Sequence, residues 1–431
     1  MSSTEQLREA LGVLTPVLDI VGAPVESAEP PAWCMERGWA EFLLSLGEQE
    51  LRACEESGLE RGLQHVPGAP RDLVALAGKV RQATALPRFR VPALSLPPAA
   101  LRGVPARKRE QLGALLGVAA PLAARAARVV DVGAGSGHLA RLSAELFRRE
   151  TLAIERESMR LRTAQQRTEQ RAQTVGPLDV RFAEAHVGLE RLELERTDLA
   201  VGLHACGELG ERLVLAAAAA RCDLLLCSCC FQKIAGAKRA MLSQAGGTLA
   251  LEKPVLGLAN LTSQAMGVEA SLGDNLRGRQ ARLGLRHLLQ ARGLALAPGE
   301  EMRGVNRRRA QAGFSELAAT VLAARQLPPP TPAELRQHAA RAEREHAAVR
   351  RLSLPRHLLS RLVEVTVVLD RGALLEEKGQ FVLVAELFEQ RITPRNTVLL
   401  ATADRDRLLL TPCSERLTAR DGAGGQASGF P

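Results

Sequence analysis

The stretch Val-Val-Asp-Val-Gly-Ala-Gly-Ser-Gly, residues 129–137, decides the fold of this chain. It predicts a short buried strand that ends near an acid, Asp131, and continues into a glycine loop and a helical stretch. This order is typical of a loop that holds part of a nucleotide cofactor. A dinucleotide fingerprint places two residues between its last two glycines, so the G-x-G-x-G spacing found here argues against NAD.

Four further strand-like runs follow the loop, at 152–155, 179–182, 199–203 and 223–227. Helical patterns lie between these runs. Strands that alternate with helices at this spacing predict a doubly wound, mostly parallel sheet. The expected fold class is therefore α/β, with a Rossmann-like architecture.

The domain organisation is predicted from the breaks in these patterns. Residues 1–100 have helical spacing interrupted by proline-rich segments, which predicts an N-terminal helical domain. The sheet domain is predicted to span 101–411, with a helical insertion at about 235–355. The tail, 412–431, is rich in Gly and Ser and is predicted to be disordered.

Three helices and a closing strand are expected after the fifth strand. The helices are placed at 260–291, at a capping box that begins with Thr331, and at 360–378. The closing strand is placed at 396–402 and is expected to pair with 408–410.

The composition fits a folded protein. The chain has 431 residues, 46% hydrophobic and 24% charged, which suggests two or three domains of about 150 residues and excludes a disordered chain. A net charge of +9 would favour an anionic partner such as RNA. Only six of the 57 basic residues are Lys, however, and Tyr is absent, as expected from drift in a GC-rich genome. The charge by itself therefore indicates no partner.

Eight cysteines are present, and five of them crowd between residues 206 and 230. This crowding is unlike a secreted disulfide framework and fits reduced thiols. The N-terminus lacks the basic and apolar regions of a signal peptide, and no apolar run reaches the roughly 18 residues of a membrane span. We therefore expect a cytoplasmic protein that does not enter a membrane, and the oligomeric state is left open.

Acids at the ends of the first strands indicate which cofactor the loop binds. Asp131 is placed to hold an ammonium group, and Glu155 closes the next strand, where ribose hydroxyls would donate to it. Glu184 follows the third strand and is the candidate partner of an adenine amino group. Together they predict S-adenosylmethionine, and the alternative is a strand-to-helix turn that binds nothing. The predicted cofactor-binding residues are Asp131, Gly133, Ala134, Gly135, Gly137, Glu155, Glu184 and His204.

A histidine and several thiols lie in two loops, 202–209 and 227–233, that leave adjacent strand ends. His204 is a candidate general base or substrate ligand, and a structural histidine is the alternative. The cysteines allow three interpretations: a nucleophile with its pKa lowered by Lys233, a zinc site, or small core residues. Because Cys-x-Cys-Cys lacks the usual C-x2-C spacing of zinc sites, no metal is predicted.

Side chains in these two loops are assigned to the reaction. The predicted catalytic residues are His204, Glu208 and Cys230, and the predicted substrate contacts are Cys206, Phe231 and Lys233. Phe231 is expected to stack on a planar substrate, because the chain has few other aromatic residues.

The chain resembles the methyltransferase-like protein 25 family from about residue 103 to 402. The motifs that carry the resemblance are 105–110, 131–138, 202–209, Cys229 with Cys230, 363–371 and 393–396. The resemblance implies a class I methyltransferase fold with S-adenosylmethionine, and it leaves the acceptor open. The sequence departs from the family where Phe231 and Gln232 replace Tyr and His, and where Glu208 replaces Asp.

A more distant likeness is to the tRNA acceptor-stem ribose 2′-O-methyltransferases, which also pair a His-x-Cys-Gly loop with a Cys-Cys-aromatic strand exit. Their zinc-binding segments are not found in this sequence. The predicted function is methyl transfer to RNA, either tRNA or rRNA, with His204 or Glu208 positioning or deprotonating the acceptor. Basic clusters at 102–109 and 307–309 support RNA. The alternatives are a protein or small-molecule methyltransferase, and a non-catalytic scaffold that binds the cofactor or RNA.

Overall fold

The structure is a computed structural model that describes residues 1–64, 66–187, 192–261, 272–297, 299–389, 392–393 and 395–409. The chain divides into two compact units. The sheet unit comprises Met1–Thr15, Arg81–Asn260 and the described residues from Arg361 onward. The helical unit comprises Pro16–Val80 and the described residues of Leu261–Ser360.

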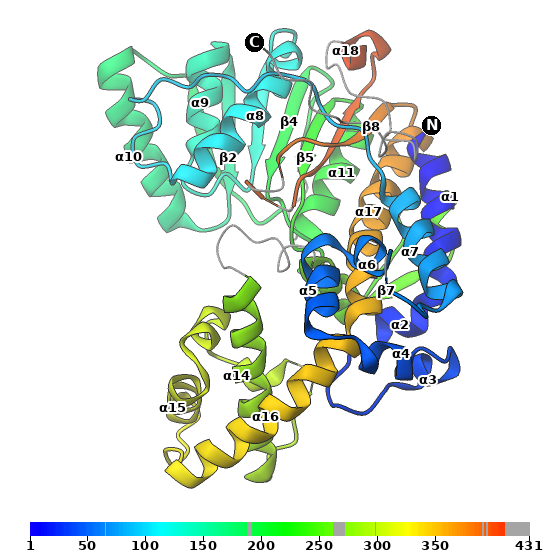
Figure 1. Ribbon diagram of the computed structural model, residues 1–431. Helices are drawn as coiled ribbons and strands as arrows, with labels where there is room; N and C mark the ends of the chain where they lie inside the picture. The colour runs from blue at the N-terminus through cyan, green and yellow to red at the C-terminus, as the bar shows by residue number, and fades with distance from the viewer. Residues whose placement is uncertain are drawn as a thin grey trace, which may run out of the picture. The chain divides into compact units, whose positions relative to one another are not determined.

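A seven-stranded sheet forms the core of the sheet unit (Figure 1). Its strands are β1 (Arg128–Val132), β2 (Glu150–Glu155), β3 (Val180–Glu184), β4 (Asp198–Leu203), β5 (Asp223–Cys227), β8 (Phe381–Glu386) and β9 (Thr397–Thr402). They lie in the order β3-β2-β1-β4-β5-β9-β8, with β9 antiparallel to both of its neighbours and the first five strands parallel. The order reverses between β1 and β4, so the predicted doubly wound, Rossmann-like α/β fold is confirmed.

The central strands are apolar along most of their length because helices cover both faces of the sheet. Val129, Leu199 and Leu225 pack on one face with apolar residues of α8 (Ala106–Ala123) and α9 (His138–Phe147). On the other face, α11 packs against β4 and β5. This two-sided burial fixes the strands, and with them the loops that leave their carboxyl ends.

Other elements complete the two units. In the sheet unit these are α1 (Ser3–Leu14), α10 (Ser158–Val175), α11 (Glu208–Ala220), α12 (Lys253–Leu258), α17 (Leu354–Glu377, from Arg361 on), α18 (Arg405–Leu409), β6 (Lys238–Ala240) and β7 (Ala250–Glu252). In the helical unit these are α2 (Leu18–Gly22), α3 (Ala32–Glu36), α4 (Ala40–Ser45), α5 (Glu48–Ser57), α6 (Leu59–Leu63), α7 (Arg71–Thr84, to Val80), α14 (Leu272–Ala291), α15 (Phe314–Ala324) and α16 (Pro332–Leu352).

The helical unit has its own apolar core. Leu285 and Leu288 of α14 and Leu317 and Val321 of α15 are fully buried in it. The guanidinium of Arg350 on α16 binds the carboxylate of Glu55 on α5 at 2.7 Å, which joins two segments far apart in the sequence.

The predicted N-terminal domain of residues 1–100 is not a single unit in the structure. Its first helix, α1, belongs to the sheet unit because the backbone N–H groups of Ser3 and Thr4 donate to the carboxylate of Glu376 on α17 (2.6 and 2.9 Å). Phe89 N donates to the carbonyl of Glu386 on β8 at 2.9 Å, so the segment after α7 also joins this unit. Only the residues between these two segments group with the insertion.

Several predicted elements are confirmed and others need correction. Thr331 and Glu334 form the predicted capping box at the start of α16. The strand expected at 396–402 is β9, but it pairs with β8, which the sequence analysis did not identify. The partner expected at 408–410 is wrong, since Leu408 lies in the short helix α18.

Some predictions fall outside the described residues. These are the disordered tail, 412–431, and part of the helix expected at 260–291, of which α14 covers the second half. Within the part of the chain that the structure describes, no helix has both the length and the apolar content needed to cross a membrane.

Candidate functional site

A cavity of about 290 Å³ opens at the carboxyl ends of the sheet, next to the reversal of strand order between β1 and β4. Open α/β sheets bind ligands at this edge. Six predicted site residues line the cavity: Gly133, Glu155, His204, Cys206, Glu208 and Lys233. Arg156, Arg160 and His186 line it as well, although the sequence analysis did not select them.

The glycine loop, whose first glycine lines the cavity, has a backbone that other residues rarely adopt. Gly133, Gly135 and Gly137 have φ angles of +77°, +57° and +69°. A Cβ atom on Gly137 would lie 2.6 Å from the Cβ of Ala164, so the glycine also permits close packing of α10. The N–H of Ala134 donates to a main-chain carbonyl of β2 at 3.0 Å, which fixes the loop. The loop therefore presents Gly133, which has no side chain, to the cavity.

Glu155 ends β2 and faces this loop. Its side chain is buried, and Oε2 accepts a hydrogen bond from the N–H of Gly135 at 2.8 Å. Oε1 accepts from the N–H groups of Arg156 and Glu157 at 3.0 and 3.1 Å. Each carboxylate oxygen has two lone pairs, so Oε2 can still accept a hydrogen bond from a ligand hydroxyl. The main chain thus holds the Glu155 carboxylate in one fixed orientation.

Asp131 lies deeper, beneath the loop. Its Oδ2 accepts from the N–H of Ala140 at the start of α9 (3.1 Å), and the side chain is buried. The pKa of Asp131 is raised to about 7, mainly by burial and also by the charge of Glu155, while Lys108 on α8 and the Ala140 N–H oppose the shift. The sequence analysis did not select Lys108, although it lies in one of the motifs that carry the family resemblance.

The raised pKa of Asp131 predicts how cofactor binding depends on pH. A ligand ammonium near Asp131 favours the ionised carboxylate, so affinity should fall as the pH falls through 7 and the free protein takes up a proton. With a pKa of about 7, the affinity for S-adenosylhomocysteine should drop roughly eightfold between about pH 7.5 and 6. Calorimetric titration at several pH values measures this, and Asp131→Asn should flatten the profile. A steep profile that persists in Asp131→Asn would assign the dependence to another group.

Glu184 is placed differently from the other predicted cofactor residues. It is exposed and pairs with Glu155 in the ladder between β2 and β3. The residues that line the cavity here are the next three along the chain, Ala185, His186 and Val187. The adenine contact of Glu184 stays a prediction, and residues 185–187 line the cavity in its place.

His204 leaves β4 in a strained conformation. Its φ angle is +66°, a left-handed backbone that costs a non-glycine residue about 1–2 kcal/mol. The His204 N–H donates to the carbonyl of Cys227 on β5 (2.8 Å), and the ring Nε2 lies 3.2 Å from Oε1 of Gln111 on α8. Strain that is held by specific bonds at a cavity wall is typical of functional residues.

The two loops that hold the remaining predicted residues are hydrogen-bonded to each other. The N–H of Glu208 donates to the carbonyl of Lys233 at 3.0 Å. Gly207, which precedes Glu208, has a φ of +54°. A Cβ atom on Gly207 would lie 1.9 Å from the carbonyl oxygen of Lys233. Only glycine permits this approach, which brings Glu208 and Lys233 to one side of the cavity.

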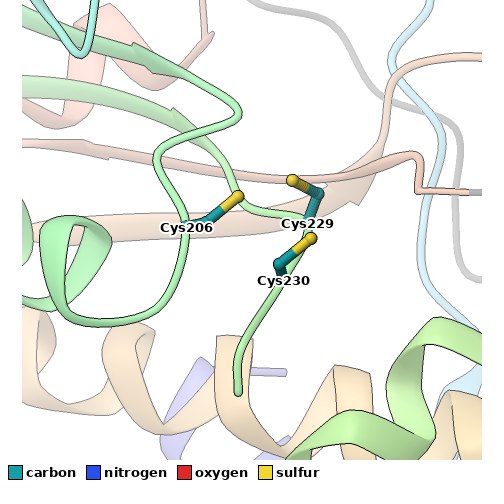
Figure 2. Close-up of side chains that lie close together, drawn as sticks. All are labelled: Cys206, Cys229 and Cys230. Carbon is teal, nitrogen blue, oxygen red and sulfur yellow. The ribbon is translucent and has the colours of Figure 1, made fainter. Parts of the chain in front are cut away.

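Three thiols meet where these loops leave the sheet (Figure 2). The sulfur atoms of Cys206, Cys229 and Cys230 all lie within 4.8 Å of one another. Hydrogen bonds from Cys206 and Cys229 lower the pKa of Cys230, and the charges of Arg395 and Lys233 lower it further. The pKa of Cys229 is raised, mainly by its hydrogen bond with Cys206. Cys230 is therefore the thiol of the three that ionises most readily.

The predicted stacking role of Phe231 is not compatible with the structure. Its side chain is 2% exposed, and the guanidinium of Arg371 lies 5.4 Å from the ring centroid. An aromatic ring covered by a cation on α17 is a core residue and cannot accept a substrate on its face. Local sequence could not indicate this contact, because Arg371 lies on a helix about 140 residues later in the chain.

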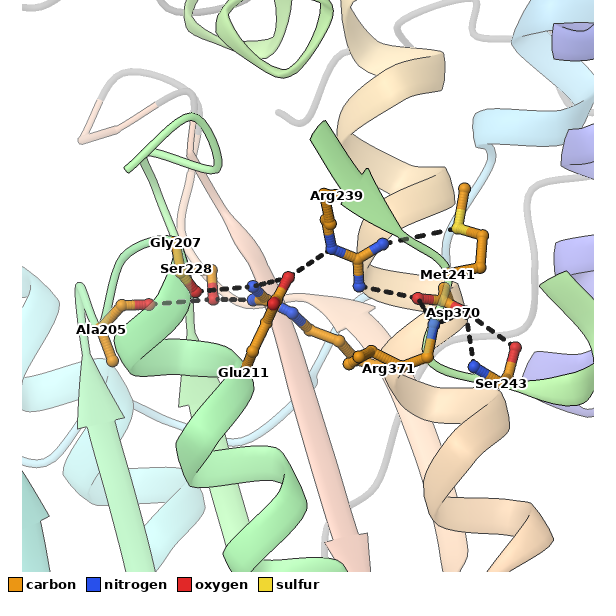
Figure 3. Close-up of polar contacts among 10 residues, drawn as sticks. Ala205, Gly207, Glu211, Ser228, Arg239, Met241, Ser243, Asp370 and Arg371 are labelled. Carbon is orange, nitrogen blue, oxygen red and sulfur yellow. Dashed lines mark hydrogen bonds and ion pairs between the residues drawn. The ribbon is translucent and has the colours of Figure 1, made fainter. Parts of the chain in front are cut away.

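A buried polar network supports the two loops from behind (Figure 3). Arg371 donates to Ser228 Oγ at 2.7 Å and to the carbonyl of Gly207 at 3.1 Å. Its neighbour Asp370 accepts from Arg239 at 2.7 Å, and Glu211 of α11 pairs with both arginines. Asp370 and Arg371 lie in the motif at 363–371, which marked them in the sequence. The motif did not indicate which residues they contact.

Residues 107–237 match the family model described as "Methyltransferase domain". No curated protein matches the chain. Among solved structures, the chain is similar to PKMT2 from Rickettsia typhi in complex with AdoHcy, with 12% identity and a TM-score of 0.23 over 44% of this chain and 34% of that one. It is also similar to coclaurine N-methyltransferase bound to N-methylheliamine and SAH, with 12% identity and a TM-score of 0.27 over 66% of this chain and 93% of that one.

The matched residues contain β1 to β5 and therefore the glycine loop, Glu155 and both thiol-bearing loops. The chain thus carries a methyltransferase domain of Rossmann-like fold, and the methyl-donating cofactor of such a domain is S-adenosylmethionine. The match says nothing of the acceptor.

Proposed function

We propose that the sheet unit is an S-adenosylmethionine-dependent methyltransferase that acts on RNA. The observation that carries this proposal is the arrangement of the cavity. Its lining combines Gly133 of the glycine loop and Glu155 with His204, Glu208 and Lys233. The resemblance to the methyltransferase-like protein 25 family is part of the same proposal.

Gly133 and Glu155 fit the cofactor. Gly133 lines the cavity without a side chain, and Glu155 has a carboxylate lone pair directed by its main-chain bonds. The negative charge of Asp131 would attract the ammonium group of the cofactor. Lys108, a cation near Asp131, would attract the carboxylate of the cofactor. When bound, the cofactor supplies an electrophilic methyl group on a sulfonium.

His204, Glu208 and Lys233 would orient the acceptor, and one of the first two would take its proton. With Gln111 Oε1 as acceptor, Nε2 of His204 carries the hydrogen, and Nδ1 holds the lone pair that can receive a proton. Glu208 lies on the same wall as a second carboxylate acceptor, next to Arg212 at 3.5 Å. Most of the rate enhancement would come from holding the acceptor atom in line with the methyl group.

Cationic side chains around the cavity support an RNA acceptor. Arg156 is exposed, and Arg160 and Lys233 line the same cavity, where phosphates could bind. The burial of Phe231 favours the second candidate, a protein or small-molecule acceptor, because no Phe or Trp is among the residues described as lining this cavity.

Methyl transfer from radiolabelled cofactor to fractionated lysate tests the proposal. We expect label in the RNA fraction that is sensitive to ribonuclease and resistant to protease, with RNA binding that weakens as salt rises. Protease-sensitive or small-molecule label would overturn the RNA assignment. Cofactor binding with no transfer to any fraction would indicate a scaffold, and absence of cofactor binding would reject the site itself.

A further inference from the structure

The strongest unexplained feature of the sheet unit is the three-thiol cluster formed by Cys206, Cys229 and Cys230. Cys206 follows β4, whereas Cys229 and Cys230 follow β5, and these two strands are parallel neighbours. Figure 2 shows the side chains converging from the two loops, and their sulfur atoms lie within 4.8 Å of one another. The spacing argument against a metal rested on the Cys-x-Cys-Cys run of residues 227–230 and included no ligand from another strand.

The backbone on both sides of the cluster is fixed. Ser228 Oγ donates to the carbonyl of Ala205 at 3.2 Å, one residue away from the cysteines of each loop. The bond from Glu208 N to Lys233 O closes the other side of the cluster. Because each loop is held by the other, the sulfur atoms are pre-positioned and do not require folding of a mobile segment.

The geometry suits a tetrahedral, thiophilic ion. Zinc–sulfur bonds of about 2.3 Å place the sulfur atoms of a tetrahedral site about 3.8 Å apart. The sulfur atoms here are at most about 1 Å farther apart, a difference that side-chain torsion changes can close. Three protein ligands leave a fourth position, as in zinc sites that bind water or a substrate atom.

The charge balance also favours a divalent ion. Three thiolates and one divalent cation carry a net charge of −1. The guanidinium of Arg395 lies 3.5 Å from the sulfur of Cys230 and is held by Asn260 Oδ1 at 3.2 Å. Its positive charge compensates the complex, and its N–H group donates to a ligand sulfur in the manner of an outer-shell partner.

We propose that Cys206, Cys229 and Cys230 bind one zinc ion, with the fourth coordination position open on the side of the cavity that Cys206 lines. Binding forms three zinc–sulfur bonds and releases the remaining thiol protons to solvent, with no change of oxidation state. A water molecule would fill the fourth position until a substrate atom replaced it. The metal site does not depend on which acceptor the enzyme methylates.

Zinc titration of the chelator-treated full chain tests the proposal. We expect one zinc per chain by elemental analysis after dialysis, and cobalt should give the visible absorption of a tetrahedral thiolate complex. Cys206→Ser, Cys229→Ser and Cys230→Ser should each weaken zinc binding by about a hundredfold or more. Cys227→Ala is the matched control, because this buried thiol lies two residues before Cys229 but outside the cluster. The Cys227→Ala variant should bind zinc as the original chain does.

Two further measurements keep the outcome interpretable. Binding of S-adenosylhomocysteine and the circular dichroism spectrum report whether each variant is folded, so that a loss of zinc in a folded variant supports the site. Substoichiometric zinc in the folded original chain, or undiminished binding in the triple Ser variant, would overturn the proposal. It would also be overturned if intact mass showed a disulfide among these cysteines that persists under reducing conditions and excludes zinc.

Discussion

Replacing Glu155 with alanine is expected to weaken the binding of S-adenosylmethionine by about ten- to a hundredfold. Main-chain N–H groups occupy three of the four lone pairs of the carboxylate, so one lone pair of Oε2 would accept a hydrogen bond from a ribose hydroxyl, and a bond to a charged group is worth about 1.5–3 kcal/mol. Since about 1.4 kcal/mol corresponds to a factor of ten, the loss of this bond gives a reduction in that range. Isothermal titration calorimetry on the purified full chain measures it.

Two variants separate this effect from damage to the glycine loop. Glu155→Gln keeps an acceptor for the Gly135 N–H but removes the charge, and should still bind at least about tenfold more weakly. Glu150 begins the same strand at its opposite end, where it pairs with Arg181 at 3.4 Å. Glu150→Ala should therefore bind within about threefold of the original chain. Equal affinities for the Glu155 and Glu150 variants would show that the cofactor lies elsewhere.

The part of the site that we propose for the cofactor could be placed from the sequence because it is encoded locally. Asp131, the glycine loop and Glu155 lie within 25 residues of one another, and their order along one strand-loop-helix-strand segment gives their order in space. Parallel topology then places the next two strand exits at the same edge. This is why His204 and Lys233 also line the cavity.

The acceptor half was less predictable because it depends on contacts that are distant in sequence. From the sequence, Phe231 could be an exposed aromatic residue. In the structure, Arg371 of α17 covers its ring. The loops of Cys206 and of Cys229 and Cys230 were predicted to leave adjacent strand ends, but the approach of the three sulfur atoms to within 4.8 Å of one another was not predicted. Tertiary packing decides such cases, because side-chain periodicity does not define which distant helix approaches.

The predicted domain boundaries differ from those of the two units for the same reason. Proline-rich breaks mark the ends of helices, but they do not indicate which helices pack together. Glu376 on α17 binds the first residues of α1 and assigns this helix to the sheet unit, whereas Arg350 on α16 binds Glu55 and unites two distant parts of the helical unit. Each assignment depends on an ion or hydrogen-bond partner about 300 residues or more away.

Replacing Asp370 with alanine should destabilise the sheet unit by about 3–5 kcal/mol, the usual result of removing one partner of a buried ion pair. Asp370 is fully buried and accepts from Arg239 at 2.7 Å (Figure 3), and from both the N–H and the hydroxyl of Ser243 at 3.0 and 2.8 Å. Without it, the guanidinium of Arg239, which is only 2% exposed on its side chain, loses a carboxylate that water cannot replace. We expect the thermal midpoint to fall by about 10 °C in calorimetry.

Asp370→Asn and Lys238→Ala define how this result is interpreted. Asparagine keeps the size and one acceptor oxygen, so most of the loss should persist if the charge of Arg239 is what requires compensation. Lys238 lies next to Arg239 in β6 but forms an exposed pair with Glu252 at 3.2 Å, so its removal should cost at most about 1 kcal/mol. If Asp370→Ala and Lys238→Ala unfold at the same temperature, the network does not stabilise this unit. If only Asp370→Ala unfolds at a lower temperature, the buried network contributes to the stability of the sheet unit. Because Arg371 of the same network donates to Ser228 and to the carbonyl of Gly207, cofactor affinity should then also be lower in Asp370→Ala.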